Sequence, residues 1–107
     1  MAKRSKFTLS FAPEAIDHLE AIEPKYHGLL RRTIHEQLMS TPMVVTRSRK
    51  PLEQPAPFDA SWELRCGPAN RFRVFYEVDA AALEVQILAV GVKDRSRLVI
   101  GGEEYES

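Results

Sequence analysis

The residues with the clearest potential for chemistry lie in one stretch at positions 62–78, WELRCGPANRFRVFYEV. Three arginines alternate with apolar residues there, on either side of the turn sequence GPAN: Arg65, Arg71 and Arg73. Alternate residues of two neighbouring strands share one face of a sheet, so we expect these guanidinium groups to emerge together. A guanidinium fork matches two phosphate oxygens at once, which makes this face a candidate phosphate site.

The segment KDRSR at positions 93–97 could approach the same surface with three further cations: Lys93, Arg95 and Arg97. Alternation by itself favours a simpler interpretation, in which the arginines line a solvated sheet face. Acidic residues could balance them on that face: Glu63, Glu77 and Glu84. Spacing alone leaves both interpretations open.

Other reactive side chains form no recognisable site. The lone cysteine, Cys66, shares the apolar side of its strand with Trp62 and Leu64, so we expect a core thiol. The histidines fall at polar helical or linking positions, without a convergent carboxylate: His18, His27 and His35. Neither a cysteine–histidine metal pattern nor a glycine-rich phosphate loop is present, so we expect no metal and no cofactor.

Two helices should precede the hairpin and support it. Residues 6–11, KFTLSF, alternate as a strand does, and Pro13 suits the first turn of a helix. That helix should bury four residues at helical spacing: Ala15, Ile16, Leu19 and Ile22. Its polar residues, His18 among them, should face outward. A second helix, joined through Pro24, should end near Pro42.

The remainder of the chain predicts a strand-rich half. Residues 42–61 contain four prolines and no clear period, which indicates a long ordered loop with room for one extended piece. The hairpin and an apolar strand at 83–92 should form an antiparallel meander. Phe75 falls on the polar side of its strand, with Arg71 and Arg73. We expect residues 93–97 to leave the sheet as a charged segment. Residues 98–107, LVIGGEEYES, should hold a short strand or form a partly ordered, acidic tail.

Length and composition fit one compact α+β domain spanning residues 1–107. The chain has 107 residues, one cysteine and a formal net charge of zero, and no apolar run approaches the roughly 20 residues of a membrane span. A basic but polar N-terminus does not resemble a signal peptide. These features predict a cytoplasmic protein without a membrane partner.

The order β-α-α-β-β-β, with FAPEAIDHLEAI, RFRVFYEV and ILAVGVKDRSR in sequence, resembles the RelE/ParE superfamily of toxin–antitoxin toxins. The resemblance covers positions 7–97. It implies an antiparallel sheet packed on an N-terminal helical hairpin, and a cognate antitoxin as partner. For the RelE branch it also implies ribosome-dependent cleavage of mRNA by the RNA's own 2′-hydroxyl, without a metal.

The resemblance assigns roles position by position. Arg73 matches the arginine of the third strand, Arg65 a basic residue of the second, and Lys93 the basic position after the last strand. These three would be the catalytic residues, and further arginines would contact RNA: Arg71, Arg95 and Arg97. Glu63 stands where the family has a lysine, and Leu98 and Val99 lie about where its catalytic tyrosine would be. Tyr105 is displaced towards the acidic tail.

Three functions therefore remain open. The first is a RelE-type endoribonuclease acting on the ribosome and mRNA. The second is a ParE-like or non-catalytic member that binds DNA gyrase or only its antitoxin, which the reversed charge at Glu63 favours. The third is a structural domain without toxicity.

Overall fold

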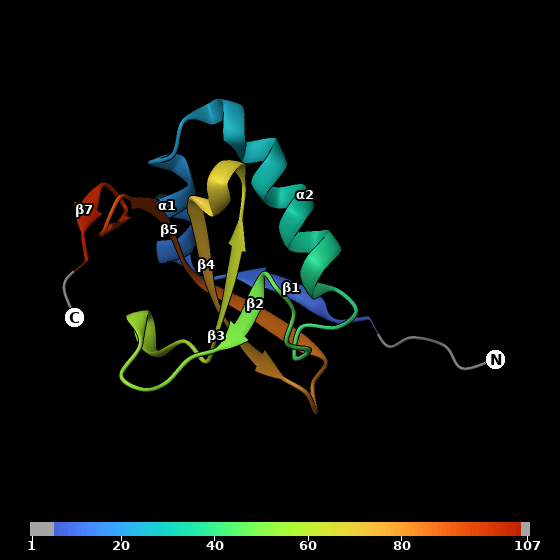
Figure 1. The fold of residues 1–107 in the computed structure, drawn as a ribbon. Helices are drawn as coiled ribbons and strands as arrows, with labels where there is room; N and C mark the ends of the chain where they lie inside the picture. Colours follow the sequence, from blue (N-terminus) through green and yellow to red (C-terminus); the bar gives the residue numbers. More distant parts are fainter. Residues whose placement is uncertain (1–5, 106–107) are drawn as a thin grey trace.

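A computed structural model describes residues 6–105, and the expected basic N-terminus and the end of the acidic tail lie largely outside these residues. Two helices, α1 and α2, cover one face of a twisted sheet (Figure 1). The helices and strands have the following bounds: β1 Thr8–Phe11, α1 Pro13–Glu20, α2 His27–Leu38, β2 Arg49–Pro51, β3 Trp62–Cys66, β4 Phe72–Asp79, β5 Glu84–Asp94, β6 Arg97–Ile100 and β7 Glu103–Glu104. The predicted α+β class is confirmed, and the predicted β-α-α-β-β-β elements are β1, α1, α2, β3, β4 and β5. Three further strands, β2, β6 and β7, extend the sheet.

The sheet follows the order β2-β3-β4-β5-β6-β7, and all neighbours along this path are antiparallel. β1 is the exception, because it pairs with β5 in parallel, from Thr8 opposite Glu84 to Phe11 opposite Ile87. β6 pairs with the later part of β5, from Gly91 onward. The main core lies between this sheet and the helices and includes Leu30, Ile34 and Tyr76.

The first helix begins at Pro13, as predicted, but it is rotated relative to the expected faces. Ala15 and Leu19 are buried, whereas Ile16 is 46% exposed and His18 is buried. The prediction that His18 faces outward is therefore wrong. On the edge of β5 opposite β4, no strand pairs with the residues between its β1 and β6 pairings, and His18 accepts a hydrogen bond from the Val90 N–H there. A buried N–H without a partner is costly, which explains this orientation.

The proline-rich segment is ordered, and its one extended piece is β2, at the edge of the sheet. Arg49 of β2 is 6% exposed and donates from Nη1 to the backbone oxygens of Gln37 and Thr41 at the end of α2. The Tyr76 hydroxyl donates to the Pro42 carbonyl at 2.7 Å. These contacts fix the first half of the segment to the core, and burial raises the pKa of Tyr76.

A second, smaller core lies on the other side of the sheet. Phe75 is 1% exposed there and packs with Ala60, Ala89 and Ile100. The prediction that Phe75 shares an exposed polar side is wrong, because the end of the proline-rich loop covers that region. Only part of this face therefore remains available for a site.

Residues 93–97 do not leave the sheet, contrary to expectation. β5 continues to Asp94, turns at Arg95 with a positive φ of 59°, and returns as β6. A second turn at Gly101 and Gly102 leads to β7, which pairs with β6. Within residues 6–105, no helix is long and apolar enough to cross a membrane.

Candidate phosphate site

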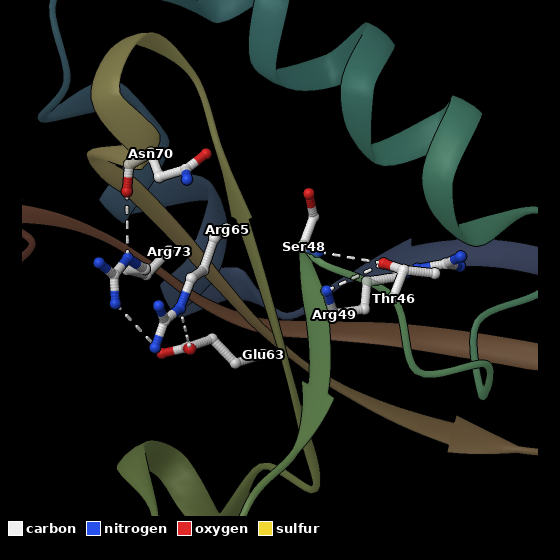
Figure 2. A network of polar contacts seen from close by, with 7 residues as sticks. All are labelled: Thr46, Ser48, Arg49, Glu63, Arg65, Asn70 and Arg73. Carbon is white, nitrogen blue, oxygen red and sulfur yellow. Dashed lines mark hydrogen bonds and ion pairs between the residues drawn. The ribbon is translucent and has the colours of Figure 1, made fainter.

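Arg65 and Arg73 are direct cross-strand partners on β3 and β4. Both side chains point away from the helices, on the face that also carries Glu63 (Figure 2). The alternation of the two strands places Leu64 and Val74 in the main core, and this fixes the two arginines on the other side. The sequence-based expectation that these two guanidinium groups emerge together is confirmed.

The Glu63 carboxylate lies between the two guanidinium groups. Arg65 Nε donates to Glu63 Oε1 at 3.1 Å, and Arg73 Nη1 lies 3.8 Å from Oε2 (Figure 2). Arg73 is held further by a hydrogen bond from Nε to the Asn70 carbonyl at 3.2 Å. Side-chain exposure is 9% for Glu63 and 15% for Arg73, against 38% for Arg65. The two carboxylate oxygens of Glu63 thus already occupy the space between the two guanidinium groups (the Arg65–Arg73 fork).

Burial lowers the pKa of Arg73, an effect that Glu63 opposes and Arg65 reinforces. An arginine still keeps its proton at physiological pH, so Arg73 offers fixed positive charge and cannot act as a base. Two like charges on facing residues repel one another, and a bound anion relieves this repulsion. The site can therefore hold a carboxylate or a phosphate, and Glu63 is its nearest proton acceptor.

Lys93 lies on the same face as Arg73. Arg73 pairs with Gly91 across β4 and β5, and Lys93 is two residues further along β5, which returns to the same side of the sheet. Its side chain lines a hollow of about 440 Å³. The other lining residues come from the loop and the C-terminal hairpin: Pro55, Pro57, Ser96, Arg97, Leu98, Glu104 and Tyr105.

Tyr105 lies closer to the candidate site than its position in the sequence indicated. The turn at Gly101 and Gly102 reverses the chain, and the Tyr105 N–H donates to the Leu98 carbonyl at 2.7 Å. The phenol therefore returns to the wall of the Lys93 hollow. The Gly-Gly pair flanked by apolar and acidic residues is a hairpin signal that could have indicated this return.

The structure does not bring the remaining arginines together with Arg65 and Arg73. Arg71 follows the short turn before β4, and its guanidinium lies 5.7 Å from the centre of the Tyr26 ring, towards the helices. Arg95 is exposed at the tip of the β5–β6 turn. Arg97 lines the Lys93 hollow but is paired with Asp94 and Glu104, at 3.7 Å and 3.5 Å.

The other candidate side chains, Cys66 and Trp62, lie in surroundings that suit a role in the core. Cys66 is buried, and burial raises the pKa of its thiol to about 11, so the nucleophilic thiolate is suppressed. Trp62 stacks on Tyr76 with ring centres 6.1 Å apart, as a core residue would. Among residues 6–105, no group of three or more His, Cys, Asp or Glu side chains could hold a metal ion.

Comparison with known proteins places the fold. No protein-family model and no curated protein matches the sequence. A chain of the RelBE2 toxin–antitoxin complex from Mycobacterium tuberculosis is similar in structure, with a TM-score of 0.65 and 22% identity, over 82% of this chain and 99% of that chain. The isolated E. coli RelE toxin gives a TM-score of 0.59 and 18% identity, over 84% and 87%. The chain has the fold of RelE toxins.

Proposed function

We propose that this protein is the toxin of a type II toxin–antitoxin system and that it cleaves mRNA on the ribosome, as a metal-independent endoribonuclease. The observation that carries the proposal is the facing pair Arg65–Arg73, on the sheet face opposite the helices in a RelE-like fold. The single chain 1–107 acts as one domain. Its expected partners are mRNA, the ribosome and a cognate antitoxin, all in the cytoplasm.

The chemistry would use the substrate's own 2′-hydroxyl as nucleophile. The 2′-oxygen forms a bond to the adjacent phosphorus, and the bond from phosphorus to the 5′-oxygen breaks, leaving a 2′,3′-cyclic phosphate. Arg65 and Arg73 would bind the non-bridging oxygens and stabilise the negative charge that develops on them. Positioning and charge stabilisation supply most of the catalysis in such a step.

Two protons must move in this reaction. Glu63 is the carboxylate beside both arginines, so it would accept the proton of the 2′-hydroxyl once the phosphate has entered the fork. The Lys93 ammonium would donate a proton to the departing 5′-oxygen, with Tyr105 on the wall of the same hollow. Arg97 would add positive charge along the RNA, and Arg71 and Arg95 would contact phosphates further away.

The antitoxin partner is inferred from the structural neighbour, which is a toxin–antitoxin complex. An antitoxin segment that reached the Arg65–Arg73 fork with a carboxylate would take the place of the phosphate, as Glu63 does within this chain. Such a contact would inhibit the toxin by competition.

A second candidate is a ParE-like or non-catalytic protein that acts on DNA gyrase or binds only its antitoxin. Glu63 favours it, because the carboxylate already neutralises part of the charge that a phosphate would need. The net charge of zero also favours this second candidate, because phosphate neutralisation supplies much of the affinity for RNA.

Reconstituted translation separates the two candidates. Purified protein is added to translating ribosomes with one defined mRNA, and the new 5′ ends are mapped, with the same mRNA free of ribosomes as control. The endoribonuclease produces cuts only in the translated mRNA. Intact mRNA in this reaction, together with a DNA-damage response on expression in cells, would instead establish the gyrase alternative.

A further inference from the structure

A second hollow, of about 310 Å³, lies between α1 and the β6–β7 hairpin. In Figure 1, β7 lies beside α1 at the end of the molecule that carries the C-terminus. The lining residues are Asp17, His18, Phe58, Ile100, Gly101, Glu103, Glu104 and Tyr105. The hollow shares the last two with the Lys93 hollow but contains none of the proposed catalytic side chains.

His18 presents a hydrogen-bond donor to this hollow. Its Nδ1 accepts from the Val90 N–H at 3.3 Å, so the proton of the neutral ring belongs on Nε2. The residue is about nine-tenths buried, and Nε2 makes no hydrogen bond to another of the described residues. Nε2 itself stays accessible, because no fully buried side-chain polar atom within residues 6–105 lacks a partner. The imidazole makes a T-shaped contact with the Phe58 ring, with ring centres 5.2 Å apart and planes at 70°. An accessible N–H without a protein partner among the described residues therefore faces the hollow.

Gly101 keeps the hollow open. A Cβ at this position would lie 3.0 Å from His18 Cδ2 and 3.6 Å from Nε2, and the backbone has a φ of +64° that side chains rarely adopt. A side chain here would therefore cover the imidazole and strain the turn. The absence of a side chain leaves room for an acceptor atom in front of His18.

The rest of the lining is acidic and aromatic. It contributes three carboxylates and no Lys or Arg: Asp17, Glu103 and Glu104. Glu104 is partly neutralised by Arg97 at 3.5 Å, whereas no salt bridge is formed by Asp17 or Glu103 within residues 6–105. These side chains form no cluster suited to a metal ion in the described part of the chain. They would also repel an RNA phosphate.

We propose that this hollow binds a basic segment of a partner protein, with an arginine or lysine side chain between Asp17 and Glu103. The aliphatic part of that side chain lies against Phe58 and Tyr105, and a peptide carbonyl of the segment accepts from His18 Nε2. The partner segment thus supplies a cation for the carboxylates of Asp17 and Glu103 and a hydrogen-bond acceptor for His18. This hollow adjoins the Lys93 hollow through Glu104 and Tyr105, but the interaction does not depend on nuclease activity.

The test is a nuclear magnetic resonance titration of the full-length ¹⁵N-labelled protein with the peptide acetyl-Gly-Arg-Gly-Arg-Gly-amide. We expect the amide signals of Phe58, Gly101 and Tyr105 to shift, together with the imidazole nitrogen signals of His18. The same peptide with glutamine in place of arginine should bind at least about threefold more weakly, because the ion pairs are lost.

Two variant proteins test which carboxylates bind the arginine peptide. The double variant Asp17→Asn/Glu103→Gln should bind the arginine peptide about threefold or more weakly than the wild type does. The control variant Glu20→Gln changes an exposed carboxylate of α1 outside the lining and should bind the peptide as the wild type does. Equal binding by the double variant would overturn the proposal. So would shifts confined to other regions, or an oligouridylate that shifts the same amides as strongly as the peptide does.

Discussion

Glu63 Oε2 and Arg73 Nη1 lie 3.8 Å apart, and the same carboxylate accepts a hydrogen bond from Arg65 at 3.1 Å. The fork that a phosphate would enter is therefore filled by an acidic side chain of the chain itself. A phosphate that binds there must displace this carboxylate from the guanidinium groups. In the proposed reaction, the displaced carboxylate would then accept the proton of the nucleophile.

Replacing Glu63 should change RNA binding and RNA cleavage in opposite directions. Glu63→Gln removes the competing charge, so the protein should bind a non-cleavable 2′-deoxy RNA analogue roughly threefold or more tightly. Cleavage should nevertheless become about 100-fold slower, because the proton acceptor is lost. Fluorescence anisotropy measures the first effect, and single-turnover cleavage on ribosomes measures the second. Faster cleavage by this variant would show that Glu63 is only an inhibitor.

Lys93 should act on the leaving group. Lys93→Gln should slow cleavage of a normal phosphodiester by about 100-fold, because the 5′-oxygen would depart without a proton. A substrate with a 5′-bridging sulfur needs no such proton and should be cleaved by the variant at close to the wild-type rate. An equal loss on both substrates would assign Lys93 to phosphate binding instead.

Arg49 should be a stability determinant. Its guanidinium donates to the carbonyls of Gln37 and Thr41, and Arg49→Met removes both of these hydrogen bonds. The free energy of unfolding should fall by about 1–3 kcal/mol, as measured by urea denaturation. Arg47→Met, two residues earlier and exposed, is the matched control and should change stability little. Equal stability of the two variants would contradict the structural role of Arg49.

His18 should make stability depend on pH. Burial lowers its pKa below the ordinary value of 6.5, although Asp17 and Glu14 oppose the shift. The unfolded chain then binds a proton more readily than the folded one, so this contribution is complete above the ordinary pKa. It is lost as the pH falls from there through the lower folded pKa.

Urea denaturation at a series of pH values measures this contribution. His18→Gln, which retains an acceptor for the Val90 N–H, should show a smaller loss of stability between about pH 7.5 and pH 5 than the wild type does. Identical pH profiles for the two proteins would assign the acid sensitivity to other groups.

The sequence predicted the parts of the fold that local pattern determines. The alternation in β3 and β4 placed Arg65 and Arg73 on one face, because the burial of Leu64 and Val74 leaves no other orientation. Pro13 correctly marked the start of α1. These features depend only on residues close in sequence.

The errors arise where distant segments meet. Phe75 is buried because a loop more than a dozen residues earlier folds over its side of the sheet, which alternation cannot indicate. His18 is buried because β5 has an unpaired N–H at Val90. Tyr105 reaches the Lys93 hollow through a hairpin formed after the predicted end of the sheet.

The most direct test of the account is the rate at which Arg73→Ala cleaves mRNA on translating ribosomes, compared with wild type and with Arg32→Ala, an exposed arginine of α2. We predict a loss of about 100- to 1,000-fold for Arg73→Ala, because a preorganised donor to the phosphate is removed. Arg32→Ala should cleave at the wild-type rate, and both variants should remain folded by circular dichroism. A folded Arg73→Ala variant that cleaves within about threefold of wild type, well below the loss expected for such a donor, would contradict the central claim.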